Sequence, residues 1–127
     1  MIYVPGHARV SEDVAWQLMA EHPFATMISV GAGEPHVTLM PVVVDIERRL
    51  LRGHLAAANP HRKLIDGRTP MTVIFHGPHA YITPKWYGHP AVPTWNYLMV
   101  EAVGVPVPAD STDALAIVRE LTDEYQG

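Results

Sequence analysis

Hydrophobic positions recur with a helical period near the start of the chain, in the stretch SEDVAWQLMAEH at 11–22. Ser11 suits the N-cap of this helix, and Glu12 and Asp13 complement its positive end. Pro23 is expected to stop it. The positions expected to share its inward face are Val14, Ala15, Leu18, Met19 and His22.

Short runs rich in β-branched and aromatic residues then alternate with turn formers. The turn-rich GAGEP at 31–35 predicts a hairpin, and 47–49 make the next turn. Only Gly77 and Pro78 separate two neighbouring runs, and 86–93 are expected to form a loop. The runs that predict strands are 24–30, 36–46, 50–56, 71–77, 79–83 and 94–107.

Two further helices are expected. Asn59 precedes Pro60 in the order typical of an N-cap and a first helical residue, which predicts a short helix to about Ile65. The C-terminal DSTDALAIVRELTDEY predicts a second amphipathic helix, capped by Asp110 or Ser111. Its expected apolar positions are Leu115, Val118, Leu121 and Tyr125.

This order of elements predicts a mainly β protein. Short strands separated by turns, with few helices, favour a small antiparallel barrel with helices on its flanks. The 127 residues fit one domain, so residues 1–127 are expected to form a single unit. With 48% hydrophobic and 17% charged residues, the chain has the composition of an ordered globule.

The chain contains no cysteine, which excludes disulfides, thiolate zinc sites and cysteine nucleophiles. The N-terminus lacks a basic and apolar leader, and no stretch approaches the roughly 18 apolar residues of a membrane span. We therefore expect a cytoplasmic protein with no membrane partner.

Charge argues against direct DNA binding. The net charge is −4, and the predicted C-terminal helix carries one arginine against five acids. Six of the nine cations fall within 48–68, which is enough for one phosphate group but too few for a duplex. These six are Arg48, Arg49, Arg52, Arg62, Lys63 and Arg68. Most of them are equally explained as solvated turn residues.

Eight histidines raise the question of a metal site, but their spacing does not support one. No HExxH helix occurs, and His76 and His79 flank a Gly-Pro turn where they need not converge. We expect no metal, with His54 and His79 the first histidines to examine. No GxSxG elbow and no nucleotide-binding loop occurs either.

An aromatic cluster is the most informative chemical feature. Lys85, Thr94 and Asn96 lie among Tyr81, Trp86, Tyr87, Trp95 and Tyr97. Together these residues are suited to a planar ring with a polar edge and a charged tail. The alternative is core packing, which we expect for at least two of the five aromatics.

Four stretches carry a resemblance to a known family. They are YVPGH at 3–7, GHLAAANP at 53–60, GPHAYITPKWY at 77–87 and VPTWNY at 92–97. In this order they resemble the PaiB-type family of FMN-binding split-barrel proteins, described as negative transcriptional regulators. The resemblance implies an antiparallel Greek-key split barrel with flanking helices. It also implies a homodimer with FMN in the grooves between subunits, and it leaves DNA binding open.

The resemblance also implies a cofactor site. A flavin presents a flat ring and a hydrogen-bonding edge, and its phosphate carries about −1.5 to −2 charges. On this interpretation the ring is walled by aromatics, Thr94 and Asn96 supply hydrogen bonds, and Lys85 or Arg52 balances the phosphate. The full set of expected cofactor-binding residues is Arg52, His54, Asn59, Lys85, Trp86, Thr94, Trp95, Asn96 and Tyr97.

The chain departs from the family pattern in several places. Where relatives commonly read HLARANPQW, it has Ala57 and Arg62 in place of an arginine and a tryptophan. If the missing arginine holds the phosphate, weaker phosphate binding is expected. Leu39 or Met40 stands where a histidine is usual, and the loop after Tyr87 is shorter. The relatives' C-terminal region is also missing, as in a compact variant or an incomplete copy.

Three functions stay open at this stage. The first is a dimeric flavin-binding protein of regulatory type. The second is a small flavin-dependent oxidoreductase, in which the cofactor does the chemistry. The third is a dimer that has lost its cofactor. The fold alone does not choose among them.

Overall fold

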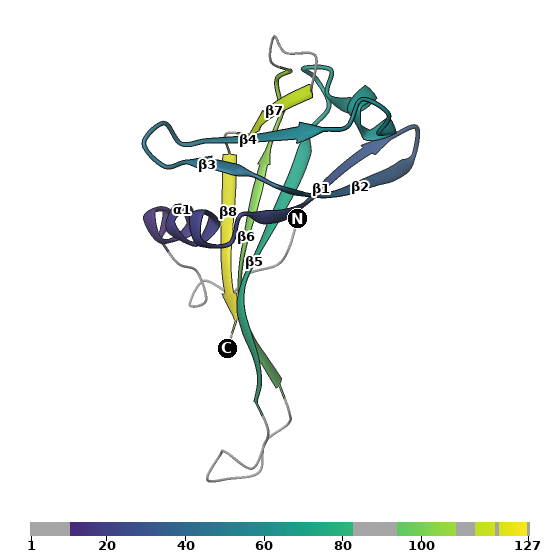
Figure 1. Ribbon diagram of the computed structural model, residues 1–127. Coiled ribbons are helices and arrows are strands. Elements are labelled where there is room, and N and C mark those ends of the chain that lie inside the picture. Colours follow the sequence, from purple (N-terminus) through teal and green to yellow (C-terminus); the bar gives the residue numbers. More distant parts are fainter. Residues whose placement is uncertain (1–10, 83–93, 109–113, 119, 127) are drawn as a thin grey trace.

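Antiparallel β-sheets carry most of the fold in the computed structural model, which describes residues 11–82, 94–108, 114–118 and 120–126 (Figure 1). The strands are β1 Phe24–Gly31, β2 Glu34–Pro41, β3 Val43–Asp45, β4 Leu50–Leu55, β5 Met71–Ile82, β6 Thr94–Gly104, β7 Ala114–Val118 and β8 Glu120–Gln126. The larger sheet has the order β2-β1-β5-β6-β8, and the smaller has the order β3-β4-β7.

The chain crosses between the two sheets at both of their edges. β2 is an edge of the larger sheet, and after Val42 the chain continues as β3, an edge of the smaller sheet. β7 and β8 make the return crossing, separated by a single residue. Because the sheets are joined on both sides, they enclose a common interior, as a barrel does. The predicted antiparallel barrel is therefore present.

Alternate residues of the strands fill this interior. Met27, Val73, Phe75 and Val100 are almost completely buried. On β1 the residues between the buried positions are less buried, which is the period-two pattern expected for a strand with one buried face. The hairpin predicted at 31–35 is confirmed, since β1 and β2 meet at a two-residue turn, Ala32-Gly33, with φ of 54° and 77°.

The break predicted at Gly77 and Pro78 is wrong. β5 runs through both residues, and its pairing with β6 shifts register between His76 and His79. Proline cannot donate to a strand ladder and is tolerated at a bulge, where one ladder bond is already missing. The Gly-Pro pair therefore bends one long strand instead of separating two.

The N-terminal helix, α1 Glu12–Glu21, begins as predicted: Oγ of Ser11 accepts a hydrogen bond of 3.3 Å from the amide of Val14. Its buried face differs from the prediction. Val14 is 49% exposed, whereas Trp16 is 1% exposed. The helix packs against β3, β5 and β6, and this contact selects Trp16 with Ala15, Leu18 and Met19.

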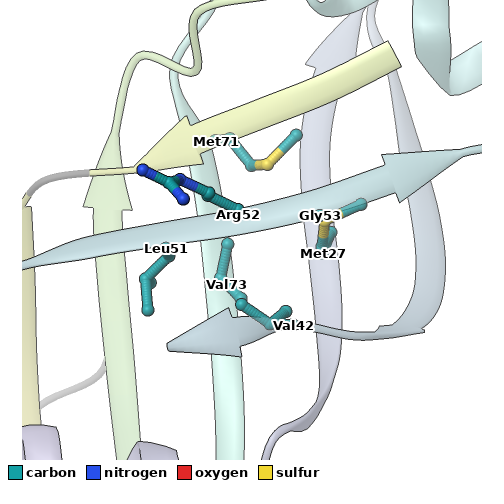
Figure 2. Close-up of a pocket in the computed structure, with 7 residues that line it drawn as sticks. All are labelled: Met27, Val42, Leu51, Arg52, Gly53, Met71 and Val73. Atoms are coloured by element: carbon teal, nitrogen blue, oxygen red, sulfur yellow. The ribbon is translucent and has the colours of Figure 1, made fainter. Parts of the chain in front are cut away.

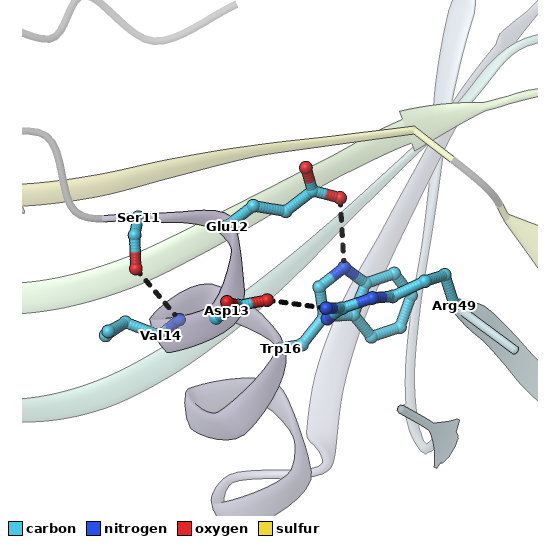
Figure 3. A network of polar contacts seen from close by, with 6 residues as sticks. All are labelled: Ser11, Glu12, Asp13, Val14, Trp16 and Arg49. Atoms are coloured by element: carbon cyan, nitrogen blue, oxygen red, sulfur yellow. Dashed lines mark hydrogen bonds and ion pairs between the residues drawn. The ribbon is translucent and has the colours of Figure 1, made fainter. Parts of the chain in front are cut away.

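Arg49, in the turn between β3 and β4, contacts the first residues of α1 (Figure 3). Its Nη2 atom donates to Oδ1 of Asp13 at 2.6 Å, and its guanidinium lies 5.4 Å from the centre of the Trp16 ring. The indole Nε1 donates in turn to Oε1 of Glu12 at 3.4 Å. These contacts hold the helix across the barrel surface.

The short helix predicted after Asn59 is confirmed as a 3₁₀ turn, η2 Pro60–Leu64. Oδ1 of Asn59 accepts a hydrogen bond of 2.9 Å from the amide of His61, as an N-cap should. Figure 1 shows η2 beside the β1–β2 hairpin.

The predicted C-terminal helix is wrong, because 114–118 and 120–126 form β7 and β8. β7 pairs with β4, and β8 pairs with β6. Both strands therefore form hydrogen bonds with backbone N–H and C=O groups at the sheet edges, which a helix would leave unpaired. This pairing outweighs the helical period of the sequence, and Ile117 and Val118 are β-branched residues that suit a strand. The predicted caps, Asp110 and Ser111, lie outside the described residues.

Candidate functional site

An open cavity lies in the connection that follows β4. It has a volume of about 410 Å³, within the range of small-molecule sites. The residues that line it are Ala57, Ala58, Asn59, Pro60, Arg62 and Lys63. Two cations and one amide thus border a space otherwise walled by small apolar groups, which is a donor set suited to an anion.

Asn59 is held in this wall by a polar network that continues into the fold. Its Nδ2 atom donates to Oγ1 of Thr38 at 3.2 Å. Oγ1 of Thr38 lies 2.9 Å from Nδ1 of His61, and Nε2 of His61 lies 2.8 Å from Oγ of Ser29. The chain of contacts therefore links the cavity to both strands of the β1–β2 hairpin.

Burial makes this network electrostatically unusual. His61 is 1% exposed and Ser29 is 3% exposed. Desolvation lowers the pKa of His61 below its usual 6.5, and repulsion from His36 lowers it further. The two imidazole rings have their centres 6.0 Å apart. The structure therefore favours a neutral ring at His61.

Arg52 and His54 share the outer face of β4. Leu51 and Leu55 are buried in the interior, while His54 is exposed and Arg52 is half-buried. Val43, which pairs with Arg52 across the strand ladder, is 61% exposed. These two predicted site residues thus lie on the strand that leads directly into the cavity-lining segment.

Between the two sheets, the described part of the chain is closely packed around a small cavity. Figure 2 shows a second cavity, of about 10 Å³, which holds about one water at most. Its lining is Met27, Val42, Leu51, Arg52, Gly53, Met71 and Val73. In the same view the guanidinium of Arg52 extends away from the apolar side chains. A flavin ring therefore does not fit in this cavity.

Four of the other predicted residues belong to a different part of the fold. Thr94, Trp95, Asn96 and Tyr97 begin β6, where they pair with the far end of β5. Figure 1 shows this β5–β6 ribbon extending beyond the barrel. The conformations of the side chains of these four residues, and both Lys85 and Trp86, lie outside the described part of the chain.

Within one copy of the chain, the predicted site residues near the cavity and those at the start of β6 are not brought together. The η2 turn, which carries part of the cavity lining, packs on β1 beyond Ile28. Ile28 pairs with Thr72, near the start of β5, so the cavity lies near that end of β5. Thr94 pairs with Ile82 at the opposite end of β5. About ten strand residues separate these levels, which corresponds to roughly 33 Å at 3.3 Å per residue.

The sequence reasoning missed three residues of the polar network: Ser29, Thr38 and His61. The period-two pattern of the strands could have indicated two of them. It places Ser29 on the same side of β1 as buried Met27, and Thr38 on the same side of β2 as buried Met40. A buried hydroxyl requires a partner, and the pattern of one strand does not reveal which distant side chain provides it.

Other kinds of site find no support in the described residues. In these parts of the chain no group of three or more His, Cys, Asp or Glu side chains is placed to hold a metal ion. No described helix is both long and apolar enough to cross a membrane.

Comparison with known proteins identifies the family. The whole chain, residues 1–127, matches the family described as "Putative FMN-binding domain". It is 32% identical over 128 residues to the Protease synthase and sporulation protein PAI 2 of Bacillus subtilis. That alignment covers 98% of this chain and 62% of PAI 2, so the chain spans less than two thirds of its relative's length.

Solved structures support the same fold. The flavocytochrome Anf3 of Azotobacter vinelandii superposes with a TM-score of 0.76 at 12% identity, over 98% of this chain and 73% of Anf3. The FMN-binding domain of a flavin reductases-like enzyme from Shewanella baltica gives 0.54 at 14% identity, over 91% of this chain and 76% of that chain. The predicted split barrel and the predicted cofactor are confirmed. The chain belongs to the family of FMN-binding domains, with the split-barrel fold, the cofactor FMN and a relationship to PAI 2.

Proposed function

We propose that this chain is an FMN-binding regulatory protein whose cofactor site is completed by a second copy of the chain. The observation that carries the proposal is the cavity after β4, where Asn59, Arg62 and Lys63 border an open space. We assign the FMN phosphate to this cavity. A phosphate monoester carries about −1.5 to −2 charges and is bound best by several donors, including a guanidinium.

The cavity is also relevant to position 57, where this chain has alanine and relatives have an arginine. Ala57 and Arg62 line the same space, so a guanidinium borders the cavity although position 57 provides none. Arginine can offer two parallel N–H groups to a phosphate. We therefore assign to Arg62 the phosphate contact that Ala57 cannot make, with Lys63 and Asn59 beside it.

A second copy is needed to complete this site. The strand that carries Trp95 and Asn96 starts about 33 Å along the ribbon from the level of the cavity, by the rise of an extended strand. This separation exceeds the length of one FMN molecule. If both groups contact the same flavin, the ring-binding residues of one subunit must meet the phosphate-binding residues of the other.

An exposed apolar face supports dimer formation. The outer side of the β1–β2 hairpin presents large hydrophobic residues, and cross-strand pairing places them on one surface. These residues are Phe24, Val30, Val37 and Leu39, each between 56% and 61% exposed. A contiguous patch of this kind on a small protein indicates an interface. We propose that this face contacts the same face, or an adjacent face, of a second copy of the chain.

A regulatory role is the finer part of the proposal. It rests on the relationship to PAI 2, whose name refers to protease synthesis and sporulation. Neither α1 nor η2 combines the length and the basic surface of a DNA-recognition helix: α1 has acidic residues in its first turn, and η2 has five residues. We therefore propose that regulation acts through a partner or through flavin occupancy.

The experiment is a flavin titration of the purified protein. FMN and riboflavin differ only in the phosphate, so the affinity ratio between them measures the phosphate contact directly. We expect FMN to bind more tightly, and we expect Arg62→Ala together with Lys63→Ala to bring FMN close to riboflavin. Arg48→Ala is the matched control, because Arg48 is an exposed turn cation that does not line the cavity.

Three outcomes would contradict the proposal. A colourless protein that binds neither flavin would leave a cofactor-free dimer as the better account. Steady oxidation of NADH or NADPH by the FMN-loaded protein would favour the oxidoreductase instead. Light scattering with and without FMN completes the test, because a monomer that binds FMN tightly would refute the shared site.

A further inference from the structure

His61 is buried under the cavity wall and joins three separate elements. One ring nitrogen lies 2.8 Å from Oγ of Ser29 on β1, and the other lies 2.9 Å from Oγ1 of Thr38 on β2. Its own amide donates to Asn59 at 2.9 Å, at the start of η2. No other described histidine has both ring nitrogens in side-chain hydrogen bonds.

A second contact holds the η2 turn against β1. Leu64, at the end of η2, packs so closely over β1 that a Cβ on Gly31 would lie 2.5 Å from Cδ2 of Leu64. The turn is therefore held by a polar anchor at His61 and an apolar anchor at Leu64. Arg62 and Lys63, the two cations of the cavity, lie between these anchors.

The hydrogen bonds are best satisfied by a neutral ring. Oγ1 of Thr38 already accepts from Nδ2 of Asn59. In either neutral tautomer, one hydroxyl donates to the ring and the other accepts from it. A protonated ring has two donors and no acceptor, so both hydroxyls would have to accept, and the one hydroxyl hydrogen that the neutral ring accepts would lose that partner.

The surroundings do not favour the charged form of the ring either. β1 contains no titratable residue. β2 contributes His36, whose ring centre is 6.0 Å away, and Glu34, which is exposed at the turn. η2 contributes the cations Arg62 and Lys63. No carboxylate among the described residues is bonded to the imidazole.

We propose that His61 is a positioning residue: its neutral imidazole holds Asn59 and the η2 turn against the β1–β2 hairpin and so keeps the cavity in the shape that receives a phosphate. The phosphate part of this inference rests on the proposed FMN site. One consequence is an acid-sensitive affinity. Protonation of His61 disrupts the network, loosens the turn and weakens FMN binding.

The first test needs no flavin. Amide hydrogen exchange in 57–63 is compared at pH 7.5 among the wild type, His61→Gln and His61→Leu. Glutamine can donate and accept but does not titrate, whereas leucine fills space without hydrogen bonds. We expect exchange about 3- to 10-fold faster in His61→Leu, as for one lost hydrogen bond, and near the wild-type rate in His61→Gln. Unchanged exchange in His61→Leu would overturn the proposal.

The second test is an FMN titration at pH 7.5 and pH 5.5. The phosphate of FMN titrates in this window too, but it does so equally for every variant. We expect the wild type to lose about 3- to 10-fold more affinity than His61→Gln on acidification. His22→Gln is the matched control and should keep the wild-type loss, because His22 lies at the end of α1 and takes no part in the network.

The outcomes separate this inference from the proposed function. If the wild type and His61→Gln lose FMN affinity in parallel, His61 does not set the pH response and the inference fails. If the wild type binds no FMN at pH 7.5, the proposed function fails, and hydrogen exchange alone then decides whether His61 positions the turn.

Discussion

The guanidinium of Arg49 covers the indole of Trp16, with 5.4 Å between Arg49 Cζ and the ring centre, and joins a helix to a turn 33 residues further along the chain. Trp16 is 1% exposed, so the cation closes one side of a core residue. The same side chain bonds to Asp13, which ties the first turn of α1 to the barrel.

Arg49→Ala is expected to reduce the free energy of unfolding by about 1 kcal/mol, because a cation-π contact contributes about 0.5–1 kcal/mol and an exposed ion pair adds little. Arg48→Ala is the matched control: Arg48 is 70% exposed and 3.9 Å from Asp45. Its effect should stay within about 0.5 kcal/mol. Chemical denaturation measures both, and equal losses would contradict the role of Arg49.

Ala57→Arg should tighten FMN binding. The new guanidinium would join Arg62 and Lys63 at the same cavity, and one added charge-assisted hydrogen bond corresponds to roughly a 5- to 10-fold gain. Riboflavin affinity should not change, since riboflavin has no phosphate. Fluorescence titration with both flavins measures the effect. Equal gains for the two ligands would place the phosphate elsewhere.

Stability should fall on mild acidification because of His61. Its pKa in the folded state is lowered, so the unfolded chain binds the proton first and unfolding is favoured as the pH falls. The contribution is complete above pH 6.5 and is lost from there down to the folded pKa. His61→Gln should show a flatter profile between pH 7.5 and 5.5 in urea denaturation.

A second, separate loss is expected in strong acid. The amide of Thr69, followed by that of Arg68, donates to Asp66 and lowers the pKa of this exposed carboxyl below 3.8. Its stabilising effect is therefore present above pH 3.8 and disappears below it. Because the Asp66 window begins only at pH 3.8, Asp66→Asn should leave the loss near neutral pH unchanged.

Leu39→Glu is expected to separate the proposed dimer. Leu39 is 59% exposed on the outer face of the β1–β2 hairpin, and a carboxylate buried there would lack a partner. We expect the dimer dissociation constant to rise at least about 100-fold, measured by analytical ultracentrifugation. Val14→Glu is the control, because Val14 is 49% exposed on α1. A stable dimer of Leu39→Glu would exclude this face.

Substituting Trp95 and Asn96 with alanine tests the ring-binding half of the site. Loss of one aromatic stacking contact should weaken binding of both FMN and riboflavin by about 5- to 100-fold. The dimer should remain intact by light scattering. This pattern differs from that of the cavity variants, which should affect FMN alone. Unchanged flavin affinity would show that the start of β6 does not contact the ring.

Local patterns in the sequence were sufficient for most of the fold. The cap at Ser11, the hairpin turn at Ala32-Gly33 and the Asn59-Pro60 helix start each depend on neighbouring residues. Alternation likewise identified strands of both sheets, with β7 and β8 as the exceptions. The family resemblance named the cofactor and a segment, Asn59 included, that lines the cavity.

Tertiary structure decided what depends on distant partners. Residues 114–126 have a helical period, yet their backbone completes the open edges at β4 and β6 and forms strands. Ser29 and His61 are 32 residues apart, and only the packing of η2 on the hairpin makes them a bonded pair. Local periodicity describes one face of one element, whereas the partner of a sheet edge or of a buried polar atom is chosen by the whole chain.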